Sequence, residues 1–227
     1  MPPKLHHTGK GFKNIYGSNC PGFFDFLKWQ WDRLWMHGPS RGSYNFPLAK
    51  SRSDLLRSNR SQTTLTWIGH ATVLLQLHGS NILTDPNFSD RASPLRFAGP
   101  KRVMPPGIAV DELPPIDVVA ISHDHYDSMD KSTIGRLRGR QGGSNTTFFV
   151  PLGLKRWFED LGISNVIEMD WWERQSRNGI EVICVPIHHW SQRVPFSRNT
   201  TLWSAWVIRD LDFSFFFAGD SGYAPHF

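Results

Sequence analysis

The stretch Ile121-Ser122-His123-Asp124-His125-Tyr126-Asp127-Ser128 decides how the rest of the chain is interpreted. It follows Ile116-Asp117-Val118-Val119-Ala120, an apolar and β-branched run that predicts a buried strand. His123, His125 and Asp127 stand at every second position, so an extended backbone places their side chains on one side. Two imidazoles and a carboxylate that converge in this way suit a divalent metal such as zinc. The alternative is a polar surface loop whose histidines bind nothing.

Two later segments repeat the pattern of an apolar strand that ends in a possible metal ligand. Residues 183–187 lead to His188-His189, and residues 215–218 lead to Gly219-Asp220. Three strands that each carry such a side chain at the C-terminal end predict one shared metal centre. His188 points away from its neighbour along an extended chain, so we do not expect it to bind the metal.

The composition is that of a folded chain with one domain. The chain has 227 residues, of which 39% are hydrophobic, and is long enough to bury a core. We find no apolar run of transmembrane length and no signal-peptide segment at the start. Only two cysteines, Cys20 and Cys184, are present, which favours an intracellular, reducing compartment. The net charge of +5 favours an anionic partner, and its scattered distribution does not select among lipid, nucleic acid and phosphorylated metabolite.

Residues 1–60 are expected to form an N-terminal arm, an amphipathic helix and a linker. The first 20 residues show no periodicity and predict a loose arm, whereas residues 21–36 carry five apolar side chains at helical spacing: Phe24, Leu27, Trp31, Leu34 and Trp35. This helix either docks on the domain or lies in a membrane interface, where tryptophan rings favour the headgroup level. Residues 38–60 are rich in Ser, Arg, Gly and Asn and predict a linker.

Residues 61–227 are expected to form the main domain. Its first three strands, separated by short turns, predict an antiparallel meander at 64–68, 73–77 and 81–84. A helix is predicted over 151–161, and further strands over 166–168, 180–185, 202–208 and 213–217. Strands that alternate with occasional helices indicate the α/β class.

These residues carry a family resemblance. The series His123-Asp124-His125-Tyr126-Asp127, with the later His189 and Asp220, resembles the metal ligands of the metallo-β-lactamase superfamily. The similarity is closer to one branch, the N-acyl-phosphatidylethanolamine-hydrolysing phospholipase D enzymes. It runs in order from about residue 64 to the end, through the blocks Thr66-Trp67-Ile68-Gly69-His70-Ala71-Thr72-Val73, Leu83-Thr84-Asp85-Pro86, Arg91-Ala92-Ser93-Pro94, Gly99-Pro100-Lys101-Arg102, Leu113-Pro114-Pro115-Ile116-Asp117, Asp170-Trp171-Trp172-Glu173 and Phe216-Phe217-Ala218-Gly219-Asp220.

The resemblance implies an αββα sandwich with two metal ions, usually zinc, at the edge of its two sheets. His123, His125 and His189 would hold the first ion, Asp127 would bind the second, and Asp220 would bridge the two. The implied activity is zinc-dependent phosphodiester hydrolysis, which converts N-acyl-phosphatidylethanolamine to N-acylethanolamine and phosphatidic acid, with Asp127 and Asp220 as catalytic residues.

Four further residues have expected roles around this site. Asp85 is expected to orient a ligand histidine without binding metal. Lys101 and Arg102 either contact a phosphate headgroup or belong to a solvated loop. His70 is expected to be a hydrogen-bonded structural histidine, with a catalytic role as the alternative. The block Asp170-Trp171-Trp172-Glu173 is expected to be core packing, with pocket lining as the alternative.

The chain departs from the family pattern in two places. Ser128 stands where the family has a histidine that binds the second ion, and the sequence ends at Phe227, before the family's last histidine ligand. We therefore expect a sandwich whose C-terminal part is missing, one complete zinc site, and a second site that lacks two ligands. A degenerate relative that binds one metal with little activity is the second hypothesis. A metallo-β-lactamase-type nuclease is the third; the basic charge permits it, and the lipase-like blocks argue against it.

The expected partner is a phospholipid substrate at a membrane surface, with no nucleic acid and possible formation of a homodimer. The expected localisation is intracellular, in the cytoplasm and peripherally associated with membranes.

Overall fold

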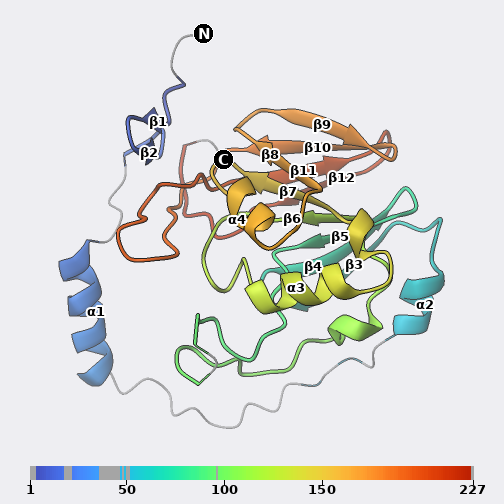
Figure 1. Ribbon diagram of the computed structural model, residues 1–227, viewed down its shortest axis with the longest axis horizontal. Helices are drawn as coiled ribbons and strands as arrows, with labels where there is room; N and C mark the ends of the chain where they lie inside the picture. The colour runs from blue at the N-terminus through green and yellow to red at the C-terminus, as the bar shows by residue number, and fades with distance from the viewer. Residues whose placement is uncertain are drawn as a thin grey trace.

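Two β-sheets packed face to face form the body of the protein (Figure 1). The structure is a computed structural model that describes residues 4–17, 22–35, 47, 49, 52–95 and 97–225. The larger sheet has six strands in the order β3-β4-β5-β6-β7-β8, and the smaller has four in the order β12-β11-β10-β9. Their bounds are β3 (Thr64–Gly69), β4 (Thr72–Leu77), β5 (Ser80–Thr84), β6 (Val118–Ala120), β7 (Thr147–Pro151), β8 (Val166–Met169), β9 (Arg174–Arg177), β10 (Ile180–Val185), β11 (Ala205–Arg209) and β12 (Ser214–Phe217).

The six-stranded sheet begins with the predicted meander and continues with parallel strands. β3, β4 and β5 are antiparallel, which confirms the prediction. His78 and Gly79 between β4 and β5 both have positive φ, the backbone of a tight two-residue hairpin. β6, β7 and β8 then pair in parallel, so they all point their C-terminal ends to the same edge. That edge holds the candidate site.

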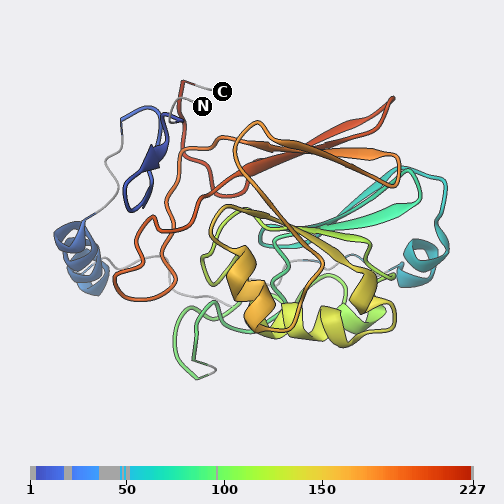
Figure 2. The same ribbon diagram turned by 45° about the horizontal axis from the view of Figure 1, so that its top comes forward.

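Helices α3 (Lys131–Gly139) and α4 (Lys155–Asp160) cover the outer face of the six-stranded sheet (Figure 2). The Asp130 side chain starts α3 by accepting a hydrogen bond from the backbone N–H of Ser132 at 3.0 Å. Ile134 and Phe158 of the helices are buried with Leu74 and Val119 of the sheet in one core. Figure 2 also shows the four-stranded sheet on the opposite side, so the layers are helix, sheet and sheet.

A second core lies between the two sheets. Because side chains alternate along a strand, Leu75 faces away from the helices and joins this second core, where it is buried with Phe149, Val182 and Trp206. The indole N–H of Trp206 donates to the carbonyl of Ile121 at 2.9 Å and so links the smaller sheet to the end of β6. These layers confirm the expected α/β class.

Several boundaries differ from the sequence-based expectations. The predicted helix at 151–161 is shorter, since Gly153 has φ of +90° and the helix begins only at Lys155. Strand β11 begins at Ala205 rather than at residue 202. β7, β9 and α3 were not predicted, and neither was α2 (Ser53–Ser58), a short helix inside the expected linker. The remaining linker residues 38–46, 48, 50 and 51 lie outside the described residues.

The N-terminal segment also differs. Residues 4–17 were expected to be loose, and this prediction is wrong for them. They form a small hairpin of β1 (His7–Thr8) and β2 (Gly11–Phe12), which contacts the body through hydrogen bonds. The predicted amphipathic helix is confirmed as α1 (Phe23–Trp35), although Pro21 and Met36 at its predicted ends lie outside the described residues. Among the described helices, none is long and apolar enough to cross a membrane.

Candidate metal centre

Loops after three strands meet at one edge of the sandwich. They are the loops after β6, β10 and β12, which carry His123 with its neighbours, His189 and Asp220 respectively. The backbone N–H of Ser204 donates to the carbonyl of Ser122 at 2.8 Å and brings the loops together. Gly219 has φ of +57°, and a Cβ atom there would lie 2.8 Å from Cβ of Ser122. A glycine before Asp220 is therefore required for the close approach.

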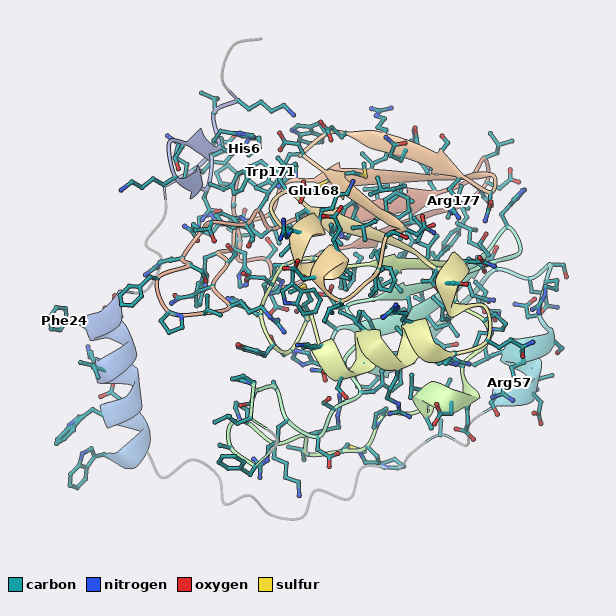
Figure 3. All side chains as sticks on the ribbon, viewed as in Figure 1. His6, Phe24, Arg57, Glu168, Trp171 and Arg177 are labelled. Atoms are coloured by element: carbon teal, nitrogen blue, oxygen red, sulfur yellow. The ribbon has the colours of Figure 1, made fainter. Side chains whose placement is uncertain are left out.

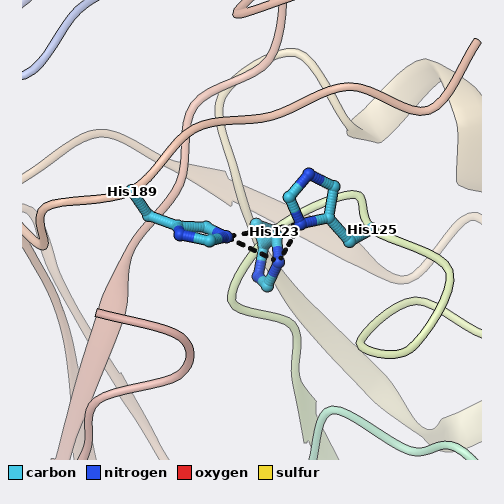
Figure 4. A group of neighbouring side chains, drawn as sticks. All are labelled: His123, His125 and His189. Atoms are coloured by element: carbon cyan, nitrogen blue, oxygen red, sulfur yellow. Dashed lines mark hydrogen bonds between the residues drawn. The ribbon is translucent and has the colours of Figure 1, made fainter. Parts of the chain in front are cut away.

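Three imidazole rings converge at this edge (Figure 4). Nε2 of His123 lies 2.8 Å from Nδ1 of His125 and 3.2 Å from Nε2 of His189, and the third separation is 3.3 Å. Nitrogens bound to one tetrahedral zinc ion at about 2.0–2.1 Å are about 3.4 Å apart. Two of the three separations match this spacing, and the third requires a small opening. The residues present therefore fit a metal ion.

Burial keeps these imidazoles neutral. Desolvation and the two neighbouring rings hold the pKa of His123 well below its usual value, and desolvation lowers the pKa of His189 to about 3. Burial also lowers the pKa of His125, against the attraction of nearby carboxylates. Neutral imidazole is the form that binds a metal. Nδ1 of His125 is the atom that faces the other two rings, whereas its buried Nε2 has no protein partner among the described residues.

Two carboxylates lie beside the imidazoles. Ligand atoms of His123, Asp127 and Asp220 all lie within 4.8 Å of one another, and Oδ2 of Asp220 is 3.9 Å from Nε2 of His123. Burial and then the charge of Asp127 raise the pKa of Asp220. A hydrogen bond from His70 lowers the pKa of Asp127. All five ligands expected from the resemblance thus lie together, in two overlapping groups of three that share His123.

His70 also lies at this site, although the sequence indicated a structural residue. It occupies the turn between β3 and β4 with φ of +51°, and its Nε2 lies 3.3 Å from Oδ2 of Asp127. The hydrogen bond with Asp127 raises the pKa of His70. A turn histidine distant in sequence from the motif gives no signal of this contact, so only the fold reveals it.

Asp85 reaches His123 through Ser122. It is fully buried, accepts the backbone N–H of Ser122 at 2.7 Å, and accepts the Ser122 hydroxyl with its other oxygen. Burial raises the pKa of Asp85 to about 8. Oγ of Ser122 in turn lies 2.8 Å from Nδ1 of His123. When Nε2 of His123 binds a metal, its Nδ1–H donates to Ser122, whose hydroxyl donates to Asp85. The expected orienting contact is therefore indirect.

Asp124, inside the motif, connects two of the loops. Its carboxylate accepts the backbone N–H of Gln192 at 2.9 Å and the hydroxyl of Thr201 at 3.1 Å. Since it alternates with His123 and His125, its side chain points away from the imidazoles and holds the loop that carries His189. The motif alone does not indicate this role of Asp124.

A groove of about 1410 Å³ adjoins the site, and His70 and Asp127 form part of its wall. Its apolar lining includes Leu55, Leu56, Trp67, Ile68, Met104 and Ile108. Lys101 and Arg102 also line it. The half-buried Arg102 donates to the backbone carbonyls of Asn87 at 2.6 Å and Ser89 at 3.3 Å, so its guanidinium is partly occupied. Lys101 is exposed.

Comparison with known proteins agrees with this geometry. The family model described as "Beta-lactamase superfamily domain" matches residues 80–226. An uncharacterised protein of Mycobacterium tuberculosis is 38% identical over 87% of this chain and 52% of its own length. N-acyl-phosphatidylethanolamine-hydrolyzing phospholipase D 1 of Caenorhabditis elegans is 41% identical over 70% of this chain and 46% of its own length. The chain thus spans about half the length of these relatives.

The fold is also similar to that of solved structures. The crystal structure of CmlA, a diiron beta-hydroxylase from Streptomyces venezuelae, is 29% identical and aligns with a TM-score of 0.55 over 74% of this chain and 31% of that chain. The family match covers more than half of the chain, and the fold and the clustered histidines agree with it. The chain belongs to the metallo-β-lactamase superfamily, within which it resembles the N-acyl-phosphatidylethanolamine-hydrolysing phospholipase D enzymes.

Proposed function

We propose that this chain is a zinc-dependent phosphodiesterase of the phospholipase D type, which hydrolyses N-acyl-phosphatidylethanolamine to N-acylethanolamine and phosphatidic acid. The observation that carries the proposal is the position of the imidazole and carboxylate cluster beside a large apolar groove. A phospholipid has a phosphodiester group that would bind at the cluster and long acyl chains that would lie in the apolar groove. Similarity to the C. elegans phospholipase supports the same substrate class.

Zinc is the proposed metal because its preferred ligands are present. Three neutral imidazoles with open space for a further ligand are a common catalytic zinc set. Zinc in such a site supplies a Lewis acid for phosphoryl oxygens and a strong nucleophile at neutral pH. Asp127 and Asp220, each about one third exposed at the side chain, face the same space and are the proposed ligands of a second ion.

His70 is the proposed proton donor to the leaving group. Its hydrogen bond with Asp127 raises its pKa, which favours a proton on the ring near neutral pH. His70 lies in the wall of the groove, within which the leaving oxygen of N-acylethanolamine would contact the imidazole. Lys101, on the same wall, is the proposed electrostatic contact for the phosphate, since Arg102 already donates to backbone carbonyls.

The test uses zinc-loaded protein and vesicles that contain N-acyl-phosphatidylethanolamine. We expect N-acylethanolamine and phosphatidic acid in equal amounts, measured by mass spectrometry, and loss of both products in His123→Ala. The exposed His78→Ala is the matched control and should retain activity. A zinc-loaded chain that yields neither product would favour the second hypothesis, a one-metal relative with little activity. Ser128, in place of a ligand histidine, is the residue that favours that alternative.

A further inference from the structure

The N-terminal hairpin contacts the loop that carries His189. The carboxamide of Asn14 forms two hydrogen bonds with the backbone of this one residue. Its Nδ2 donates to the carbonyl of His189 at 2.9 Å, and its Oδ1 accepts the N–H of His189 at 3.2 Å. Asn14 is only 8% exposed, so its side of these part-buried bonds is shielded from water. We propose that Asn14 is a positioning residue for His189 and that residues 4–17 act as a clamp that increases the metal affinity of the site.

The chemistry of the side chain explains the choice of asparagine. A carboxamide has a donor and an acceptor at the spacing needed to satisfy both backbone groups of one residue, as a neighbouring strand would. Oδ1 also accepts the indole N–H of Trp203 at 3.0 Å, and that N–H is shared with the carbonyl of Ile187 at 3.1 Å. Asn14 therefore connects His189, the preceding loop residues and the fully buried Trp203 in one network.

A second group of contacts anchors the hairpin to the body. Both oxygens of Asp170 are used: one lies 2.7 Å from Nε2 of His6, and the other lies 2.9 Å from Nε2 of His7 and 2.7 Å from Nζ of Lys4. The His6 ring stacks on Trp171 with centroids 4.2 Å apart, and Figure 3 shows the two residues side by side. The ammonium group of Lys4 already neutralises this carboxylate, so the cluster anchors the hairpin and is a poor site for a second cation.

The hairpin also packs closely on the segment after His189. Gly11 has φ of +152°, and a Cβ atom there would lie 2.0 Å from the carbonyl oxygen of Asn199. The N–H of Phe12 donates to this same carbonyl at 2.8 Å. Asn199 is itself bonded to Ser191, two residues beyond His189, by its N–H and its side-chain oxygen. The loop is therefore restrained on both sides of the ligand.

Clamping of the ligand backbone couples arm docking to metal binding. A fixed His189 does not lose freedom when the ion binds, so the clamp lowers the entropic cost of metal binding. Because coupling is reciprocal, bound metal should hold the arm in place to the same extent. This inference rests on the proposed metal centre. Its tests distinguish a failure of the clamp from a failure of the metal centre.

The first test compares Asn14→Ala and Asn14→Asp with the parent chain. We expect the dissociation constant for Zn²⁺, measured by competition with a chromogenic chelator, to rise about 10- to 100-fold, as for other groups that orient metal ligands. The Asp variant keeps one acceptor but places a second carboxylate oxygen against the carbonyl of His189, so it should lose at least as much affinity as the Ala variant. The Co²⁺ absorption spectrum should shift in both variants because the ligand geometry changes.

Asn81→Ala is the matched control. Asn81 is also buried, at 4% exposed, and its Nδ2 donates to the carbonyl of Pro115 at 2.8 Å, remote from the metal ligands. The Asn81→Ala substitution should lower the thermal stability of the chain without changing its affinity for Zn²⁺. An equal affinity loss in Asn81→Ala, or unchanged affinity in Asn14→Ala, would overturn the clamp. A parent chain that binds no Zn²⁺ would overturn the metal centre as well.

The second test needs no variant to fold. Lys10 and Lys13 are exposed trypsin sites within the clamp. We expect Zn²⁺ to slow cleavage after both residues at least tenfold in the parent chain, while cleavage after the exposed Lys155, outside the arm, changes little. Equal cleavage of the arm with and without bound Zn²⁺ would show that docking and metal binding are independent, contrary to the inference.

Discussion

His70 Nε2 and Asp127 Oδ2 lie 3.3 Å apart, which joins the turn between β3 and β4 to the loop after β6. The contact lowers the pKa of the carboxylate and raises that of the imidazole, so each group favours the charged form of the other. The turn between β3 and β4 thus brings an imidazole with a raised pKa to a carboxylate at the metal centre.

We expect His70→Gln to reduce phosphodiester hydrolysis about 10²- to 10⁴-fold, the range for loss of a general acid. The zinc content should not change, since the three-imidazole group excludes His70. His78→Gln is the control because His78 has nearly the same backbone, with φ of +49° in the next hairpin turn, and is exposed. Equal rates in parent and His70→Gln would remove His70 from the reaction.

Metal content is the next expectation. We expect close to one tightly bound zinc per chain, because His123, His125 and His189 form a sufficient set and the second group has only His123, Asp127 and Asp220. His189→Ala should release the ion, whereas Asp127→Asn should retain it. Elemental analysis after dialysis gives the ratio directly. Two tightly held ions, or none in folded protein, would contradict this view.

Ser128→His tests the departure from the family pattern. Ser128 is fully buried, so a larger imidazole must displace its neighbours at a cost of about 1–3 kcal/mol of stability. We expect only a modest gain in affinity for a second metal. Calorimetric titration with Zn²⁺ and a urea unfolding curve would measure the two effects. Ser128→Thr is a control for added volume without a ligand nitrogen. Full two-metal binding in Ser128→His would show that this position alone limits the second site.

The motif predicted the site better than the periodicity predicted the fold. The structure places all five expected ligands together, as their positions in the motif and at strand ends predicted. Their clustering could be inferred because it depends on these positions along the sequence. The expected extended backbone is wrong beyond His123, because residues 124–128 form a bend and a turn in which the N–H groups of Ser128 and Met129 donate to the carbonyl of His125. The partners of these residues, such as His70 and Asn14, depend on contacts across the fold, and no local pattern contains them.

Missed elements have similar causes. β7 is fully buried and apolar after Thr147, and periodicity alone does not distinguish such a short run from a buried helix segment. The hairpin of residues 7–12 has almost no apolar pattern, because Phe12 is its one side chain packed against the second core and the other contacts are made by Asp170 and backbone bonds. Its order comes from side chains more than 160 residues away, as the 164-residue separation of His6 and Asp170 shows.

Stability should depend on pH through Asp170. Burial opposes ionisation, but hydrogen bonds from Lys4, His6 and His7 outweigh it and lower the pKa to about 2, below an unfolded value near 3.9. A carboxylate with a lowered pKa stabilises the fold above the unfolded pKa and loses this effect as pH falls through the folded pKa. The contribution, about 2 kcal/mol, should therefore disappear between about pH 5 and 2.

The measurement compares urea unfolding of the parent and Asp170→Asn from pH 7 to pH 2. Glu173, 3.7 Å from Lys4, is the other acidic group at this anchor and stays in both proteins. The difference in free energy of unfolding between the parent chain and Asp170→Asn should become smaller as the pH falls. Asp160→Asn, at an exposed position of α4, serves as the control. A difference that remains constant down to pH 2 would refute the assignment.

Membrane binding through α1 is the last expectation. Phe24, Trp31 and Trp35 are 83%, 63% and 69% exposed, at positions that share one helical face, and the net charge of the chain is +5. Trp31→Glu with Trp35→Glu should weaken binding to anionic vesicles about tenfold, without loss of zinc. Leu211→Glu, at another exposed apolar position, is the control. Unchanged sedimentation with vesicles would assign α1 a purely structural role.

The distance along the chain between Asn14 and His189 has a consequence for biosynthesis. The two residues are 175 positions apart, so a ribosome that adds about 5–20 residues per second makes Asn14 roughly 9 to 35 s before its partner. The arm can therefore complete these contacts only after the segment up to Trp203 has left the exit tunnel. The metal ligands emerge in the same order, His123 first and Asp220 last, so the arm gains its last partner shortly before the metal centre gains its last ligand.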